Sequence, residues 1–371
     1  MVFRCFGSSS VDRRRNTVQA QQEVSENLLG SVKNFSYDEL RKATNDFNFS
    51  NKIGRGGFGI VYKGILKNGM PVAVKVLSSE SKQGSKEFLT EINTIANVKH
   101  PNLVELIGCY NQGMRRMLVY EYLENNSLDH ALLGSKRTTN LEWGKRSAIC
   151  IGTAKGLAYL HEELDPSIVH RDIKASNILL DKDFIPKIGD FGLAKLFPDT
   201  ITHISTKVAG TTGYLAPEYM FGGQLTRKAD VYSFGILILE VVSGRSNTRS
   251  NWGGLEKLLL EWAWELYEEE RLIELVDNEM EDFPKNEVIR YMKVALFCTQ
   301  AAANRRPLMS QVVEMLSRKI RLNEKELTAP GYFQYAGESS QSHKNGKLSD
   351  ETSTSYQMSS APFSITQVSP R

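Results

Sequence analysis

A single loop, residues 170–177 (HRDIKASN), combines a carboxylate, an amine and a carboxamide. Phosphoryl transfer needs groups of these kinds: Asp172 can accept or orient the proton of an acceptor hydroxyl, Lys174 can offset charge on the transferring group, and Asn177 can hold a magnesium ion. A polar surface loop could carry the same residue types without this chemistry. The loop therefore constrains the fold strongly, because the other parts of a phosphate-transfer site must come from distant segments.

Residues 53–61 (IGRGGFGIV) predict a glycine-rich turn between two strands. Missing side chains let backbone N–H groups approach phosphate oxygens. A dinucleotide-binding fold would need a helix directly after the glycines, but apolar and polar residues continue to alternate over residues 61–66, and Asn68 and Gly69 then indicate a turn. A hairpin is therefore the favoured interpretation. The nucleotide contacts predicted for this segment are Ile53, Gly54, Gly56, Gly57, Phe58, Gly59 and Val61.

A strand expected around Lys75 places Ala73 and Lys75 on one face, because strand side chains repeat every two residues. A small residue beside an amine suits a flat base next to its phosphates. The charge of Lys75 needs a partner, and Glu91 lies on the apolar stripe of a helix predicted over residues 85–98. Glu87 is the rival, one turn earlier, with apolar neighbours on one side only. We therefore predict a Lys75–Glu91 ion pair.

Two more motifs follow the loop. A short strand over residues 185–189 ends at Asp190 of an Asp-Phe-Gly triplet, and residues 216–218 read Ala-Pro-Glu. Magnesium prefers a few hard oxygen ligands together with phosphate, so Asp190 and Asn177 suffice as its protein ligands. With the glycine-rich loop, the Ala-Val-Lys strand, the helix glutamate and the His-Arg-Asp loop, six motifs stand in one order. In this set the chain resembles the eukaryotic protein kinases.

The resemblance implies an α+β, bilobal fold. A small lobe with an antiparallel sheet and one main helix would lie against a larger, mainly helical lobe, with an ATP cleft between them and Mg²⁺ beside the nucleotide. It also implies that Glu218 pairs with Arg306 and that Asp230 braces the backbone of the catalytic loop. Tyr120 would be the gatekeeper beside a hinge formed by residues 121–124. The residues implied to contact adenine are Val61, Ala73, Tyr120, Glu121, Leu123 and Leu179.

Lys174 and the Gly210-Thr211 pair resemble serine/threonine kinases, which implies protein substrates with Ser or Thr acceptors. Arg171 beside the catalytic aspartate implies docking of a phosphate from the activation segment, with Lys195 as a further basic partner. The candidate hydroxyls between Asp190 and Glu218 are Thr200, Thr202, Ser205, Thr206, Thr211 and Thr212. We predict Thr206 as the principal switch, because Thr211 is better explained as a structural contact of Asp172 and Lys174.

A pseudokinase or scaffold module in a receptor complex is the alternative. Pseudokinases typically lose one of four residues, and all of them are present here: Lys75, Asp172, Asn177 and Asp190. The complete motif set therefore favours an active enzyme.

A chain of 371 residues exceeds the size of one typical core, so two lobes with tails are expected. Residues 34–50 predict a lead-in helix packed on the small lobe, in a segment that resembles the lead-in of plant receptor-like kinases. With no span or ectodomain recognised, the chain resembles a plant receptor-like cytoplasmic kinase, which implies an upstream receptor kinase or co-receptor. The predicted regions are a flexible extension (1–33), the lead-in (34–50), the kinase domain (51–320; small lobe 51–120, hinge 121–124, large lobe 125–320) and a disordered tail (321–371).

The net charge of +3 gives no support for nucleic-acid binding. The four cysteines show no disulfide or metal spacing, which predicts free thiols in a cytoplasmic protein. Val2 excludes N-myristoylation and leaves Cys5, with three nearby arginines at 13–15, as a palmitoylation candidate for peripheral contact with the plasma membrane. A solvated tail with an isolated cysteine explains the same residues and is the favoured interpretation.

Overall fold

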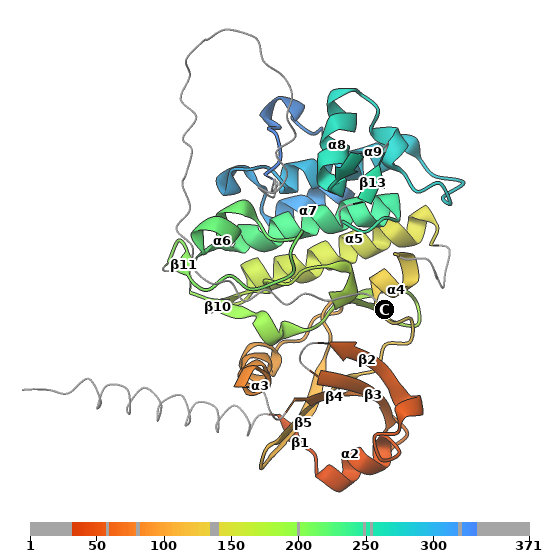
Figure 1. Ribbon diagram of the computed structural model, residues 1–371, viewed down its shortest axis with the longest axis vertical. Coiled ribbons are helices and arrows are strands. Elements are labelled where there is room, and N and C mark those ends of the chain that lie inside the picture. Colours follow the sequence, from red (N-terminus) through yellow and green to blue (C-terminus); the bar gives the residue numbers. More distant parts are fainter. Residues whose placement is uncertain are drawn as a thin grey trace, which may run out of the picture.

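The computed structural model describes residues 32–56, 59–78, 82–133, 141–198, 201–247, 250–252, 255–317 and 321–331. They form a small lobe built on one sheet and a larger helical lobe (Figure 1). The predicted bilobal α+β fold is confirmed. Within these ranges, no helix combines the length and the apolar character that crossing a bilayer requires.

The small lobe is a sheet with one parallel and otherwise antiparallel pairings. Its strands, in spatial order, are β1 (Lys33–Asn34), β5 (Leu106–Gln112), β6 (Arg115–Glu121), β4 (Pro71–Leu77), β3 (Gly59–Ile65) and β2 (Lys52–Gly56). The predicted hairpin after the glycine-rich loop is present, because β3 and β4 pair from Gly59 to Ile65 and Gly69 adopts φ 82° in the turn between them. Helix α3 (Lys82–Ile95) packs against the sheet through Phe88, Ile92 and Ile95, which are buried.

The segment before the sheet differs from the prediction of a helix over residues 34–50. It contains β1, then α2 (Tyr37–Ala43) and then the short turn η1 (Phe49–Asn51). Ser36 and Glu39 form a capping box at the start of α2, and Leu40 is fully buried. Lys33, predicted to lie in a flexible extension, pairs with Gly108 of β5. A two-residue strand leaves no periodicity in the sequence, so this pairing was not predictable from the pattern.

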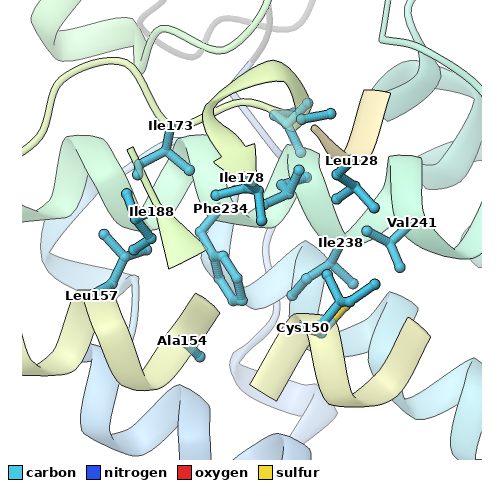
Figure 2. Close-up of a cluster of buried hydrophobic side chains, with 14 of the residues drawn as sticks. Leu128, Cys150, Ala154, Leu157, Ile173, Ile178, Ile188, Phe234, Ile238 and Val241 are labelled. Carbon is cyan, nitrogen blue, oxygen red and sulfur yellow. The ribbon is translucent and has the colours of Figure 1, made fainter. Parts of the chain in front are cut away.

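The large lobe surrounds two long helices, α5 (Trp143–Ala158) and α7 (Arg227–Ser243). Figure 2 shows Ala154 and Cys150 of α5 facing Phe234 and Ile238 of α7, and Leu157 beside Ile188. Because α7 is buried along almost its whole length, it can act as a rigid support for loops at its start. The remaining helices are α4 (Leu128–Leu132), α6 (Pro217–Gly222), α8 (Leu259–Glu268), α9 (Lys285–Cys298) and α10 (Met309–Ser317), and turns of helix lie at η2 (Tyr159–Glu163), η3 (Ala175–Asn177), η4 (Phe191–Leu193), η5 (Leu272–Leu275) and η6 (Ala303–Arg305).

Four short antiparallel strand pairs lie among the described residues outside the small-lobe sheet. They are β7 (Ser167–Val169) with β10 (Lys195–Phe197), β8 (Ile178–Leu180) with β9 (Pro186–Ile188), β11 (Ile204–Ser205) with β12 (Gln224–Leu225), and β13 (Ser250–Trp252) with β14 (Leu255–Lys257). The catalytic loop thus runs from β7 to β8, and Asp190 follows β9 directly.

The end of the large lobe also differs from the prediction of a disordered tail over residues 321–371. Residues 321–331 contain η7 (Glu324–Glu326), and Leu322 and Leu327 pack on the core of the large lobe. These two apolar contacts were not predicted, because the composition of the tail as a whole is polar. The remainder of the predicted tail, residues 332–371, lies outside the described residues, as does the predicted extension up to residue 31 with Cys5.

Candidate active site

Lys75 lies between two carboxylates, one from each lobe. Its Nζ is 2.7 Å from Glu91 Oε1 on α3 and 2.8 Å from Asp190 Oδ1 at the turn before η4. The Glu91 side chain is fully buried, whereas those of Lys75 and Asp190 are 12% and 33% exposed. The predicted Lys75–Glu91 pair is therefore present, and Asp190 joins it. The rival Glu87 is also buried on α3, where it packs close to Gly192.

The charges of this cluster keep Lys75 protonated. Burial alone would lower the pKa of Lys75, but the charges of Asp190 and Glu91 outweigh burial and raise that pKa far above its usual range. Burial would raise the pKa of Asp190, but the charge of Lys75 outweighs it and lowers that pKa. At Glu91 burial dominates, and the pKa is raised despite the attraction of Lys75. A permanently charged amine is suited to binding phosphate.

The Tyr120 hydroxyl donates a hydrogen bond to Glu91 Oε2, so both oxygens of this carboxylate are engaged. Tyr120 lies near the end of β6 and is buried. Burial raises the pKa of Tyr120 well above its ordinary value, so the phenol remains a donor. The sequence placed Tyr120 beside the nucleotide but missed this bond, because nothing in the strand pattern shows that a polar tip would reach α3.

Three polar side chains surround Asp172 of the catalytic loop. Thr211 Oγ1 donates to Asp172 Oδ1 at 2.7 Å, and Lys174 Nζ lies 2.9 Å from Asp172 Oδ2 and donates to Thr211 Oγ1 at 2.7 Å. Asn177 Nδ2 donates to the Asp172 carbonyl and to Oδ2, at 2.7 and 3.0 Å. The predicted contact of Thr211 with Asp172 and Lys174 is therefore present. It fixes the carboxylate while leaving the Asn177 amide oxygen available.

The backbone of this loop is braced by Asp230 at the buried start of α7. Its carboxylate accepts hydrogen bonds from the N–H groups of His170 and Arg171, at 2.7 and 2.8 Å. His161 Nε2 lies 2.9 Å from the same carboxylate, a contact that no pattern in the sequence predicts. The His170 ring packs edge-on against Phe191, with centroids 4.8 Å apart. The loop and the Asp-Phe-Gly turn are thus held against one another.

Residues implied to contact adenine come from three neighbouring strands of the small-lobe sheet and from β8 of the large lobe. Val61 pairs with Lys75 across β3 and β4, and Ala73 pairs with Tyr120 across β4 and β6. Leu179 lies on β8 and packs against the core together with Ala73. The sheet register therefore places the expected small and apolar side chains beside the Lys75 cluster.

The hinge residues Glu121 and Leu123 differ in which of their groups are already engaged in contacts within the protein. The Glu121 N–H donates to the Glu105 carbonyl at 3.2 Å, so an adenine contact at Glu121 can come only from its own carbonyl. Its side chain is 2.9 Å from Lys187 Nζ. Leu123 is buried. These contacts fix the chain where the two lobes join.

The glycine-rich loop is described on both sides of its tip. Gly54 lies on β2, paired with Val61, while Ile53 is 38% exposed. A Cβ at Gly59 would come within 2.2 Å of the Val76 carbonyl, which explains a glycine at this position. Gly56 ends β2 and pairs with Gly59. The predicted contacts Gly57 and Phe58 lie outside the described residues.

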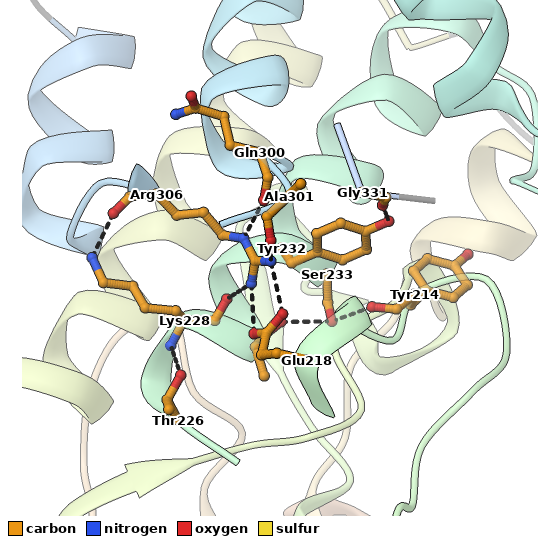
Figure 3. A network of polar contacts seen from close by, with 11 residues as sticks. Tyr214, Glu218, Thr226, Lys228, Tyr232, Ser233, Gln300, Ala301, Arg306 and Gly331 are labelled. Carbon is orange, nitrogen blue, oxygen red and sulfur yellow. Dashed lines mark hydrogen bonds and ion pairs between the residues drawn. The ribbon is translucent and has the colours of Figure 1, made fainter. Parts of the chain in front are cut away.

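The activation segment is anchored by two arginines. Arg171 donates to the carbonyls of Leu193 and Lys207, at 3.1 and 2.9 Å, and to the Tyr219 hydroxyl. Arg306 holds Glu218 with two bonds of 2.8 Å, as the resemblance implied (Figure 3). The role of Tyr219 was missed, because an aromatic residue in a short helix carries no pattern that distinguishes a polar contact from ordinary packing.

The donor set fits a magnesium ion. Asp190 and Asn177 supply hard oxygen atoms close to Lys75 and Asp172, which is the chemistry that Mg²⁺ prefers when phosphate provides the other ligands. In the described part of the chain, no cluster of three or more His, Cys, Asp or Glu side chains is placed to hold a metal.

A small sheet lobe and a helical lobe that share a Lys75–Asp190 contact, with a braced acid on the catalytic loop, define a phosphotransferase of the protein-kinase class. Residues 47–316 match the family model described as protein tyrosine and serine/threonine kinase. The chain belongs to this protein kinase family.

Similar proteins from Arabidopsis thaliana agree with this assignment. The chain is 54% identical to cold-responsive protein kinase 1 over 322 residues, which cover 86% of this chain and 82% of that protein. It is 56% and 52% identical to two proteins named "Probable LRR receptor-like serine/threonine-protein kinase", over 80% and 87% of this chain. The chain spans only 29% and 31% of the length of these two relatives.

Proposed function

We propose that this protein is an active serine/threonine kinase that transfers the γ-phosphoryl group of MgATP to protein substrates. The observation that carries the proposal is the 2.8 Å contact between Lys75 Nζ and Asp190 Oδ1, which joins segments 115 positions apart at one point. A pseudokinase role is disfavoured, because the four residues that pseudokinases typically lose are all present. Lys75 contacts Asp190, and Asn177 contacts Asp172.

The mechanism requires positioning and electrostatic stabilisation more than covalent chemistry. Lys75, oriented by Glu91, would bind the phosphates of ATP. Asp172 would orient the acceptor hydroxyl and take its proton, while Lys174 stabilises charge on the group in transfer. Asp190 and Asn177 would hold the magnesium ion, which neutralises phosphate charge when bound.

Serine/threonine specificity is supported by the contact of Thr211 with Asp172 and Lys174 and by the names of the relatives. We expect the purified protein, supplied with ATP and Mg²⁺, to label serine and threonine on a generic protein substrate. Phosphoamino-acid analysis measures this, and omission of Mg²⁺ should abolish the labelling. Label confined to tyrosine would contradict the proposed specificity, and no label under any condition would contradict catalysis.

Thr206 is the proposed activating phosphorylation site. Arg171 already contacts the carbonyl of the next residue, Lys207, at 2.9 Å. Partial burial, and then the positive charges of Arg171 and Lys86, lower the pKa of Lys195, which indicates a cationic cluster beside the segment. Ser205 is the exposed alternative. A phosphate near this cluster would form charge-assisted hydrogen bonds that order the segment.

We expect Thr206→Ala to lower the activity of protein purified from cells by about tenfold or more, because one or more such bonds are lost. The measurement is the initial rate of substrate phosphorylation. Thr202→Ala is the matched control, since Thr202 is an exposed threonine of the same segment. Equal rates for the parent and Thr206→Ala would remove Thr206 from this role.

Action downstream of a membrane receptor kinase is also proposed, supported by the receptor-like names of two relatives. Peripheral membrane contact through Cys5 stays a prediction from the sequence.

A further inference from the structure

Residues 321–331 run along one side of the large lobe as a segment that we term the clasp. Its outer part is held by Glu324, whose carboxylate lies 2.6 Å from Lys293 Nζ on α9. Its inner part pairs with residues 299–301 at the end of α9. There the Gly331 N–H donates to the Thr299 carbonyl at 3.1 Å, and the Ala301 N–H donates to the Ala329 carbonyl at 3.4 Å. The clasp lies beyond the residues matched by the family model, which end at 316.

Gln300 connects the clasp to the Glu218–Arg306 pair. Its side-chain Oε1 accepts hydrogen bonds from the N–H and the hydroxyl of Thr328, at 3.2 and 3.0 Å. Its backbone carbonyl accepts from Arg306 Nε at 2.8 Å, and the Ala301 carbonyl accepts from Arg306 Nη2 at 3.1 Å. One short segment therefore pairs with the clasp on one side and orients Arg306 on the other.

The clasp also contacts the start of α6 directly. A Cβ at Gly331 would come within 2.5 Å of Pro217 Cγ, so the glycine backbone packs against the residue that precedes Glu218. The Gly331 carbonyl accepts a hydrogen bond from the Tyr232 hydroxyl, as Figure 3 shows beside the Glu218–Arg306 pair. Arg306 in turn lies over the Tyr232 ring, 5.0 Å from its centroid.

The start of α6 is connected to the active site, because it follows the segment that carries Thr211, which donates a hydrogen bond to Asp172. Between them, the Tyr214 carbonyl accepts a hydrogen bond from Ser233 on α7 at 2.7 Å. Pro217 follows Thr211 by only six positions, so movement at Pro217 would still be transmitted along the chain to the loop that receives the acceptor residue of a substrate. The Lys75 cluster lies in a different part of the fold and makes none of these contacts among the described residues.

We propose that the clasp is a positioning element: by holding residues 299–301 and Pro217, it fixes the Glu218–Arg306 anchor and with it the peptide-binding side of the active site. The proposal rests on the proposed kinase function for its kinetic consequences. Its structural consequence, protection of residues 206–223, does not depend on activity.

The test uses the full chain with Gly331→Leu, whose side chain cannot fit against Pro217. Gly144→Leu is the matched control, because a Cβ at Gly144 meets open space. We expect Gly331→Leu to raise the KM for a peptide substrate about three- to tenfold, the size expected from the loss of one or two hydrogen bonds. The KM for ATP should stay unchanged, and hydrogen exchange over residues 206–223 should accelerate. A variant that only lost folded protein would show a lower rate with both KM values unchanged.

Tyr232→Phe, which removes only the hydroxyl that binds Gly331, provides a second test if Gly331→Leu does not fold. A higher KM for the peptide with an unchanged KM for ATP, together with faster exchange over residues 206–223, would support the proposal. Both effects should be smaller than in Gly331→Leu. Unchanged peptide KM and exchange in Tyr232→Phe, or a Gly331→Leu protein that matches Gly144→Leu, would overturn it. If the parent protein proves inactive, the proposed function fails, while the exchange measurement still decides whether the clasp holds the segment.

Discussion

Asp172→Asn is expected to remove almost all turnover while nucleotide binding is retained. Asparagine has the shape of aspartate, and its amide oxygen can still accept the hydrogen bond that Thr211 donates to Oδ1, although the bond that Asn177 donates to Oδ2 is lost. It cannot accept a proton from a substrate hydroxyl. Proton transfer by a positioned side chain typically contributes about 10²- to 10⁴-fold, so kcat should fall by a factor in this range. The measurement is kcat with saturating ATP and protein substrate, together with the Kd for ATP.

The control is Asp183→Asn, which changes an exposed aspartate paired only with its neighbour Lys182 in the described contacts. This variant should retain the parent rate. An Asp172→Asn protein with parental Kd for ATP and parental Tm, but undiminished kcat, would show that another group takes the proton. Loss of ATP binding together with a lower Tm would indicate misfolding, and the active-site assignment would then need a different variant.

Contacts could be predicted from the sequence where a buried charge had few oppositely charged side chains as possible partners. Lys75, flanked by valines on a strand, required a carboxylate, and a helix stripe presented Glu91. Asp190 was predicted as a metal ligand, but its direct contact with Lys75 was not predicted, because it depends on how two lobes approach one another. The same limit applies to Tyr120 and Glu91, where a hydrogen bond forms between a strand and a helix that are distant in the chain.

The two differences in the fold have a common cause. Lys33 joins the sheet through backbone hydrogen bonds, and Gly331 joins the large lobe in the same way. Backbone groups are present at every residue, so a sequence does not show where they will pair unless side-chain periodicity marks a strand. The polar composition around both residues instead indicated extensions. Whether such a segment pairs depends on the surface of the folded protein beside it, which is β5 for Lys33 and the end of α9 for Gly331.

Lys75→Met is expected to abolish detectable phosphorylation by removing the ammonium group that would bind the phosphates. It also leaves Glu91 buried without its cation. Breaking a buried pair typically costs about 3–5 kcal/mol, because an uncompensated charge remains. The pKa of Glu91 is already raised by burial, so loss of Lys75 should raise it further, and the group can escape part of this cost by taking up a proton. Thermal unfolding and initial rates are the measurements.

The pH dependence follows from the sign of that shift. A carboxyl whose pKa is higher in the folded than in the unfolded state binds more protons when folded, so stability falls as pH rises between the two values. The Tm of Lys75→Met should therefore fall further below that of the parent as pH increases from about 4.5, the ordinary pKa of glutamate. Lys99→Met, which breaks an exposed pair with Glu105, should show no such widening.

The double variant Lys75→Met/Glu91→Gln separates the two roles of Lys75. A neutral amide at position 91 removes the buried charge and can still accept the hydrogen bond from the Tyr120 hydroxyl. Most of the lost stability should return, and the Tm difference from the parent should become insensitive to pH, while phosphorylation stays absent. If activity returned with stability, Lys75 would serve only to neutralise Glu91. If stability did not return, the stabilising partner of Lys75 would have to be Asp190, since both carboxylates lie within 2.8 Å of its ammonium group.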